Sequence, residues 1–366
     1  MAPPPNVFCV DALAAETAPA QPGFGAVWFP LPCHVSFGGA VEVLEPGHAI
    51  CPLHYHLREE EMLYVLDGEV TVRELPHGAG PEAPYREFAV RAGELVVWAA
   101  GTGVAHQTRN DGAVAARYVV LSDRCAQDVC VYPDSGKMAV RGVGVGVYTP
   151  RGATPRSAAE VIAAAAAIAA RRPSVRLRDD ERPAHVADPT RVPEHRQAEG
   201  RASRRELARA AGAKVLFVHV GRLAPGAVTA PLHAHMADEE LVLVLAGHPT
   251  LRQRGGRREG RTPVFDAPDE RTRLAPGDGV HWAPGGLVAH QLLNETDDDA
   301  LLLVIGTDRA SDDVVHYPER GEVLVAALAP TPHDAPSRAV SPFDGDASVL
   351  RFEPTDYFAG EVARPT

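Results

Sequence analysis

The chain has no excess of basic charge. Its 366 residues include 36 Lys and Arg against 48 Asp and Glu, which gives a formal net charge of −12. A nucleic-acid-binding surface needs a concentrated basic face to neutralise phosphates. The basic stretches RQRGGRREGR and ARRPSVRLR lie beside acidic ones, so we expect solvated loops there, with an anion site as the alternative. The composition therefore argues against a nucleic-acid partner.

Long apolar runs and a regular cysteine framework are also missing. The longest near-continuous apolar stretch, VIAAAAAIAA at 161–170, is too short and too rich in alanine to span a bilayer. Residues 1–24 lack the basic start and apolar core of a signal peptide. The five cysteines show no even, closely spaced pattern. We therefore expect a cytoplasmic protein with reduced thiols and no membrane partner.

What the chain does contain is an internal repeat. The stretch PLHYHLREEEMLYVLDG at 52–68 returns as PLHAHMADEELVLVLAG at 231–247, with the histidines and the last glutamate in register. A second block, AGELVVWAAGTGVAHQTRN at 92–110, returns as PGDGVHWAPGGLVAHQLLN at 276–294. A third, DVCVYPDSGK, returns as DVVHYPERGE. Three blocks in the same order indicate a tandem duplication.

Each copy is expected to consist of strands. EMLYVLDGEVTVRE alternates apolar and polar residues and turns at Asp67-Gly68, and several short apolar runs follow, a pattern typical of a sandwich or barrel. Between the copies, Ser157 and Glu160 form a capping-box pattern ahead of helix-forming residues that end before Pro173. This predicts a helix at about 157–171, and RRELARAAG at 204–212 predicts a shorter one.

The histidines and glutamates have the spacing of metal ligands. Residues two apart on a strand point to the same face, so His54 and His56 project together. Glu61 begins the next apolar strand, and His106 follows a later turn. Three imidazoles and one carboxylate that converge inside a barrel form a site for a divalent transition metal. The second copy repeats the arrangement with His233, His235, Glu240 and His290.

The spacing G-x(6)-H-x-H-x(4)-E-x(6)-G, followed by G-x(6)-(P/A)-G-x(4)-H-x(3)-N, closely resembles the two motifs of the cupin superfamily, and it occurs twice. The positions that fill it are Gly47, His54, His56, Glu61, Gly68, Gly93, His106 and Asn110, then Gly226, His233, His235, Glu240, Gly247, Gly277, His290 and Asn294. Ala100 stands where a proline is usual, and the turn-to-histidine spacing is slightly long. The chain thus resembles a bicupin, and its YPDSGK and YPERGE blocks are similar to those of a bacterial subgroup whose members mostly lack an assigned reaction.

The resemblance implies an all-β fold of two double-stranded β-helix (cupin, jelly-roll) barrels in tandem, joined by a short helical linker. The expected divisions are an N-terminal extension at 1–24, cupin domain 1 at 25–140, a linker at 141–212, cupin domain 2 at 213–330 and a C-terminal tail at 331–366. It also implies one divalent transition metal per cupin domain. Iron is the first expectation, and manganese, nickel, copper and zinc are also compatible, since selectivity follows geometry and metal supply.

Strand alternation also predicts the pocket walls and the residues that face away. Pocket candidates are Leu63, Val65, Thr108 and Trp98 in the first copy, and Val242, Leu292 and Trp282 in the second. The acids Glu59, Glu60 and Glu239 are expected to be solvated, and Cys51 is expected to turn away from the metal as a packed thiol. Gln107 and Gln291 are expected to make structural hydrogen bonds, and Asn110 and Asn294 to brace turns. No general acid or base can be named.

The first functional hypothesis is a non-haem dioxygenase, an oxidoreductase that acts on a small chelating organic substrate such as an enol, phenol or carboxylate. One alternative is a non-redox isomerase, decarboxylase or lyase that uses the metal as a Lewis acid. Another is a non-catalytic metal- or ligand-binding bicupin. The first copy is slightly more polar, with Thr108 where the second has Leu292, and is favoured as the reactive one. A monomer that mimics a cupin dimer and a homo-oligomer are both compatible with the sequence.

Overall fold

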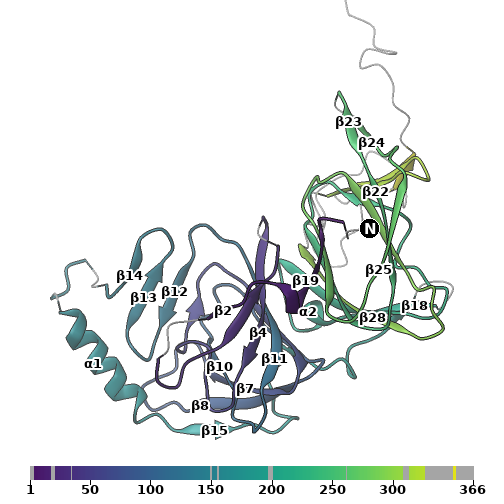
Figure 1. Cartoon of the computed structure of the whole chain (residues 1–366). Helices are drawn as coiled ribbons and strands as arrows, with labels where there is room; N and C mark the ends of the chain where they lie inside the picture. Colours follow the sequence, from purple (N-terminus) through teal and green to yellow (C-terminus); the bar gives the residue numbers. More distant parts are fainter. Residues whose placement is uncertain are drawn as a thin grey trace, which may run out of the picture.

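Short apolar strands separated by glycine turns build two barrels in tandem (Figure 1). The computed structural model describes residues 4–17, 21–33, 35–148, 151–154, 156–196, 201–260, 262–307, 313–325 and 349–351. Most of the predicted tail at 331–366 therefore lies outside the described residues. The expected all-β fold with two cupin-like barrels is confirmed, and no helix among the described residues is long and apolar enough to cross a membrane.

Barrel one is built from three sheets. The largest has the order β16-β9-β6-β11-β4-β3-β2. Its strands are β2 (Glu16–Thr17), β3 (Val27–Pro30), β4 (Phe37–Leu44), β6 (Glu61–Asp67), β9 (Leu95–Trp98), β11 (Ala116–Asp123) and β16 (Val186–Ala187). The second sheet contains β7 (Glu69–Leu75), β8 (Tyr85–Arg91), β10 (Ala105–Arg109) and β15 (Ser174–Arg176). The third contains β5 (Tyr55–His56), β12 (Val129–Tyr132), β13 (Lys137–Val140) and β14 (Gly144–Gly146).

Barrel two repeats this plan. Its largest sheet has the order β1-β26-β21-β28-β19-β18-β17. The strands are β1 (Val7–Cys9), β17 (His195–Arg196), β18 (Ala202–Glu206), β19 (Leu216–Leu223), β21 (Glu240–Ala246), β26 (Asp278–Trp282) and β28 (Ala300–Thr307). The next sheets are β22 (Thr250–Gly255) with β25 (Asp269–Arg273) and β27 (Val288–Leu293), and β20 (Ala234–His235) with β29 (Val314–Tyr317), β30 (Glu322–Val325) and β31 (Val349–Arg351). A hairpin of β23 (Arg257–Glu259) and β24 (Thr262–Val264) projects from this barrel (Figure 1).

The turn predicted at Asp67-Gly68 joins β6 to β7, and its counterpart at Gly247 follows β21. Both glycines have a positive φ, 78° and 77° respectively. At Gly247 an added Cβ would lie 2.5 Å from the carbonyl oxygen of Asp299, so no larger residue fits without a backbone shift. Glycine is therefore required here by both conformation and space.

The segment between the barrels does more than connect them. The predicted helix is present as α1 (Ala158–Ala169), and Ser157 and Glu160 form the expected capping box at its start. The shorter prediction corresponds to α2 (Leu207–Ala210). A 3-10 turn, η1 (Val10–Ala12), follows β1. The same connecting segment also supplies β15 and β16, which pair with β8 and β9 of barrel one.

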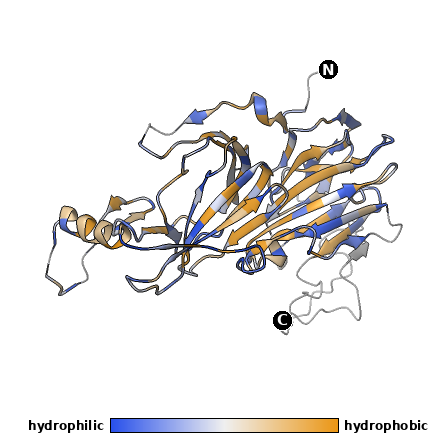
Figure 2. Ribbon diagram, turned by 90° about the horizontal axis from the view of Figure 1, so that it is seen from below, coloured by the Kyte–Doolittle hydropathy of each residue, from blue (hydrophilic) through white to orange (hydrophobic). Residues whose placement is uncertain are grey.

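Each barrel is completed by a strand from outside its own repeat. β16, which follows barrel one in the sequence, is the edge strand beside β9, while β1 at the other end of the chain is the edge strand beside β26. The outer faces of the two large sheets, which point away from the barrel interiors, pack together in one hydrophobic core, which includes Phe37 and Leu121 from barrel one and Leu216 and Ile305 from barrel two. Figure 2 shows these strands coloured mainly as hydrophobic and the outer loops mainly as hydrophilic.

Two fully buried glutamates join the barrels. The Glu60 carboxylate accepts hydrogen bonds from the backbone N–H groups of Lys214, Val215 and Leu216 at 2.6, 3.0 and 3.0 Å. The Glu239 carboxylate accepts from Val35 and Phe37 at 3.3 and 3.4 Å, and also from the N–H of Ser36 between them.

The expectation that these acids are solvated is therefore wrong. Glu60 and Glu239 are both 0% exposed, and Glu59 is 3% exposed and paired with Arg141. The sequence could not reveal this burial, because the donors to Glu60 and Glu239 come from the opposite barrel.

Replacing Glu239 with alanine is expected to lower the free energy of unfolding by about 2–4 kcal/mol, because three backbone N–H groups and the His281 imidazole lose a buried charged partner. The thermal unfolding midpoint of Glu239→Ala should fall clearly, and that of Glu239→Gln, which keeps one acceptor oxygen, should fall less. Exposed Glu82 provides the matched control. A midpoint for Glu239→Ala equal to that of Glu82→Ala would contradict this role.

Candidate metal centres

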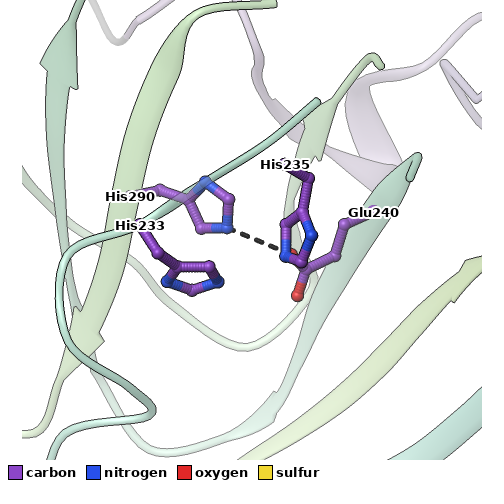
Figure 3. A group of neighbouring side chains, drawn as sticks. All are labelled: His233, His235, Glu240 and His290. Carbon is purple, nitrogen blue, oxygen red and sulfur yellow. Dashed lines mark hydrogen bonds and ion pairs between the residues drawn. The ribbon is translucent and has the colours of Figure 1, made fainter. Parts of the chain in front are cut away.

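The predicted group of barrel two is assembled in the structure (Figure 3). His235 lies on β20, Glu240 is the first residue of β21, His290 lies on β27, and His233 pairs with His290 through an isolated β-bridge. One ligand atom from each of the four residues lies within 4.8 Å of all the others. The Glu240 Oε2 atom is 3.0 Å from His290 Nε2 and 3.5 Å from His235 Nε2. Four donors from separate segments thus converge on one point.

Barrel one gathers the same residue types around Glu61, but only His54, Glu61 and His106 have ligand atoms that all lie within 4.8 Å of one another, while His56 forms a separate such group with His54 and Cys130. Glu61 Oε2 is 3.0 Å from His106 Nε2, 3.3 Å from His56 Nε2 and 3.5 Å from His54 Nε2. Glu61 is the first residue of β6, and His54 forms an isolated β-bridge with His106. The structure therefore brings together all eight residues that the sequence analysis assigned to metal binding, four in each barrel.

The second nitrogen of every one of these histidines faces an acceptor. In each barrel two histidines donate from Nδ1 to the carbonyl oxygen two residues earlier, and the third donates to a buried aspartate. The distances are His54–Pro52 3.0 Å, His106–Val104 3.4 Å and His56–Asp128 2.6 Å, then His233–Pro231 2.9 Å, His290–Val288 3.3 Å and His235–Asp313 2.7 Å. Because Nδ1 carries the proton, the Nε2 lone pairs point into the centre.

The charges within each group are set by burial and by the neighbours. Burial raises the pKa of Glu61, but His106 and the other imidazoles outweigh it and hold that pKa well below its usual range. Glu240 behaves in the same way beside His290. Burial, together with His290, lowers the pKa of His233 to about 3. Burial also lowers the pKa of His54, His56 and His235, but Cys51 and the neighbouring carboxylates outweigh it and hold these three pKa values above the usual range. Metal binding requires neutral imidazoles, so it would release protons from these histidines.

A tryptophan stacks on one histidine of each group. The rings of Trp98 and His106 lie 3.8 Å apart and nearly parallel, and Trp98 Nε1 donates to Glu74 Oε1 at 2.8 Å. Glu74 also bonds to His185, which lies just before β16, at 2.7 Å.

Barrel two repeats this chain of contacts with different residues. Trp282 stacks on His290 at 3.8 Å and donates to Gln253, which in turn accepts from Asn6, just before β1. In each barrel, therefore, the segment that crosses from outside the repeat is connected to a histidine of the central group.

The cavities beside the two groups differ in size. Barrel one has an open cavity of about 1190 Å³ that contacts His54, His56 and Glu61. Barrel two has one of about 420 Å³ that contacts His235 and His290. On β19, Phe217 and His219 stand where β4 has Gly38 and Ala40, so larger side chains occupy the corresponding space in barrel two.

The predicted pocket residues fall into two sets. Thr108 and Leu63 line the cavity of barrel one, and Trp282 lines that of barrel two. Four others lie within the hydrophobic cores of the barrels, where neighbouring apolar side chains cover them: Val65, Trp98, Val242 and Leu292. They share the inward face of their strands with the ligands, but that face extends beyond the cavity.

The prediction that Cys51 is a packed thiol is wrong, because the residue lines the cavity of barrel one. Its Sγ atom lies 3.5 Å from His54 Nδ1, the nitrogen on the far side of the ring from the centre. Residues 51–53 are not part of a strand, so alternation does not apply to them. The predictions for the amides are confirmed. Gln107 and Gln291 donate to the backbone oxygens of Cys51 and Ala230, and Asn110 and Asn294 bind the carbonyls of Leu44 and Leu223 across their turns.

Two polar residues of the barrel-one cavity were missed by sequence reasoning. Glu42 on β4 and Tyr118 on β11 are direct cross-strand partners, and both line the cavity. Burial, with a smaller contribution from the charge of Glu61, raises the pKa of Glu42 to about 8. The available signal was an acid within the apolar run AVEVL, at a position where the second copy has Gly221.

Comparison with known proteins agrees with this architecture. Solved structures similar to the chain include the oxalate decarboxylase of Lactobacillus farciminis in its formate complex, at 15% identity and a TM-score of 0.51, covering 83% of this chain and 86% of that one. The oxalate decarboxylase of Bacillus subtilis at pH 4.6 matches at 16% identity and a TM-score of 0.51, covering 83% and 78%. Another structure of the Bacillus subtilis enzyme, from work on its Mn(II) centres, matches at 17% identity and a TM-score of 0.51, covering 84% and 78%.

At these identities the likeness concerns the fold alone. No sequence among the curated proteins matches the chain. The sequence pattern of the cupin domain, however, matches twice, at residues 40–122 and 219–306, and each match contains one complete group of three histidines and one glutamate. The chain therefore belongs to the cupin superfamily and is a bicupin, with two cupin domains in tandem.

Proposed function

We propose that this bicupin is a metal-dependent enzyme whose barrel one acts on a small chelating carboxylate in a non-redox reaction such as decarboxylation. The observation that carries the proposal is the large cavity of barrel one, which joins a histidine–glutamate group to several polar side chains. Barrel two holds an equivalent group beside a smaller cavity.

The residues of each group fit a divalent metal. Neutral imidazoles and one carboxylate are ligands that first-row divalent ions accept, and three histidines with one glutamate leave coordination positions for water or substrate. Each Nδ1 donates to a fixed acceptor, as is usual for metal-binding histidines. A bound metal would act as a Lewis acid towards the oxygens of a chelating substrate. The protein would orient that substrate and, with Leu63 and Val120, exclude water from one wall.

The cavity of barrel one has more polar and reactive side chains than the equivalent positions of barrel two. At five equivalent positions of the two repeats, barrel one has polar or reactive side chains and barrel two has small or apolar ones, whereas at a sixth, Ala40 and His219, the polar side chain is in barrel two. The five pairs are Glu42 and Gly221, Cys51 and Ala230, Thr108 and Leu292, Tyr118 and Leu302, and Cys130 and Val315. All five barrel-one residues line the cavity. This difference supports barrel one as the reactive barrel.

The similar solved structures support decarboxylation over oxygenation, since they are oxalate decarboxylases and one of them has Mn(II) centres. In decarboxylation the bond between the carboxylate carbon and its neighbour breaks, carbon dioxide leaves, and a proton takes its place. A dioxygenase is the second candidate, because the same ligand set also accepts iron and the apolar wall limits access of water.

Metal content tests the two-centre arrangement. Protein purified without an affinity metal column should contain about two divalent ions per chain by elemental mass spectrometry. His54→Ala/His56→Ala and His233→Ala/His235→Ala should each lose about one ion per chain, because each removes two ligands from one barrel only. No bound metal after reconstitution would refute the proposal.

The buried aspartates should tune the two centres independently. Asp128→Asn is expected to weaken metal binding in barrel one by about 10–100-fold, because the amide is a weaker acceptor for the N–H of His56. Asp313→Asn should do the same to barrel two through His235. Competition with a chromophoric chelator measures both affinities, and each variant is the control for the other. Equal weakening of both sites by one substitution would contradict this assignment.

Measurements of carbon dioxide release and oxygen consumption distinguish the candidate reaction classes. Manganese-loaded protein incubated with oxalate and other two- to four-carbon carboxylates should release carbon dioxide without net oxygen consumption. His54→Ala/His56→Ala should reduce this release on the order of 100-fold or more, because it removes the Lewis acid. His233→Ala/His235→Ala should reduce it much less. Stoichiometric oxygen uptake would favour the dioxygenase, and metal binding without turnover would favour a binding protein.

A further inference from the structure

The deep wall of the barrel-one cavity contains two buried polar groups without hydrogen-bond partners. Glu42 is 8% exposed and Tyr118 is 0% exposed. Among the described residues, neither Glu42 Oε2 nor the Tyr118 hydroxyl has a hydrogen-bond partner. The two side chains lie close enough for Tyr118 to oppose the rise in the Glu42 pKa, but they do not meet with hydrogen-bonding geometry. Such groups are costly to bury unless a ligand or water satisfies them.

These groups belong to the same cavity as the histidine–glutamate group. On β11, Tyr118, Val120 and Ser122 alternate onto the inner face, and Ser122 is the cross-strand partner of Glu61. On β4, Gly38 and Ala40 precede Glu42 on that face and also line the cavity. A small molecule that contacts the histidines can therefore extend along this wall towards Glu42.

Barrel two lacks both groups. The ladder between β19 and β28 places Gly221 opposite Leu302, at the positions where β4 and β11 place Glu42 opposite Tyr118. The strand pairing that closes the two barrels is otherwise the same, with Leu44 opposite Ala116 and Leu223 opposite Ala300. The pair is thus not needed to build the barrel, which points to a role in ligand recognition.

We propose that Glu42 and Tyr118 together bind a hydroxyl or enol group of a chelating carboxylate whose acidic oxygens lie at the His54, His56 and Glu61 group. A hydroxyl can donate to an oxygen of the Glu42 carboxyl group while it accepts from the Tyr118 hydroxyl, so one group satisfies both residues. A ligand that lacks the hydroxyl leaves both unsatisfied, and sites of this kind discriminate strongly. The proposal rests on the proposed function, because it assumes that barrel one holds a metal and a carboxylate ligand.

Malonate and 2-hydroxymalonate form a matched pair of probes, since both chelate through two carboxylates and only the second has a hydroxyl. Titration calorimetry should use the full chain with His233→Ala/His235→Ala, loaded with Mn(II), so that only barrel one holds metal. 2-Hydroxymalonate is expected to bind about tenfold more tightly than malonate, because its hydroxyl binds between the two residues.

Glu42→Gln and Tyr118→Phe, which nearly conserve volume, should each weaken 2-hydroxymalonate binding about five- to tenfold and change malonate binding less than about twofold. Glu45→Gln, the same substitution three residues further along at an exposed position, should change neither. The proposal is overturned if the two probes bind equally to the parent protein. Equal weakening of both probes by the two variants would overturn it as well.

Metal content measured on the same samples separates this proposal from the proposed function. Normal metal loading with malonate binding, but no hydroxyl preference, would refute the Glu42–Tyr118 site and leave the metal-dependent enzyme standing. Failure of barrel one to hold metal, or of both probes to bind the loaded chain, would refute both proposals.

Discussion

Two adjacent glutamates at the start of one strand connect the barrel interface to the candidate metal centre. Alternation directs Glu61 into barrel one, where it meets three histidines, and Glu60 outward, where it accepts three N–H groups of barrel two. Glu240 and Glu239 repeat this pair in the opposite direction. Any shift of either strand would displace a ligand and an interface acceptor together. The fixed position of each barrel against the other therefore also holds one ligand of each centre in place.

A second connection reaches the centres from the crossing segments. His185 and Asn6 lie just before the edge strands that each barrel receives from outside its repeat, and they bind Glu74 and Gln253 respectively. Those two residues hold the tryptophans that stack on His106 and His290. The orientation of the His106 and His290 rings therefore depends on residues that do not contact these rings directly. The residue that accepts from the tryptophan differs between the repeats: it is the carboxylate of Glu74 in barrel one and the amide of Gln253 in barrel two. The order of contacts is the same in both barrels.

The sequence predicted what depends on local spacing and on the repeat. Period-two alternation and the duplicated motifs were sufficient for the two barrels and the eight residues that converge in the two groups, and the capping box of Ser157 and Glu160 was sufficient for helix α1. What it missed depends on partners remote in the chain. The burial of Glu60 requires backbone donors near residue 215, and the pairing of Glu42 with Tyr118 requires the register of β4 against β11. Cys51 was misplaced because a strand rule was applied to a turn. The sequence could not show the exchanged edge strands either, since β1 and β16 are only two or three residues long.

The exchanged edge strands also determine the order in which the chain can fold. Val7 pairs with Val280, so β1 is made about 270 residues before its partner strand. At typical rates of synthesis this corresponds to a wait of roughly 15 to 55 seconds. Barrel one can close soon after β16 emerges, whereas barrel two needs a segment that left the ribosome much earlier and stayed unpaired. A nascent chain that exposes an unpaired strand for this long is a candidate substrate for chaperones. A segment that contains only the second repeat would lack β1, so it would leave the edge of β26 unpaired.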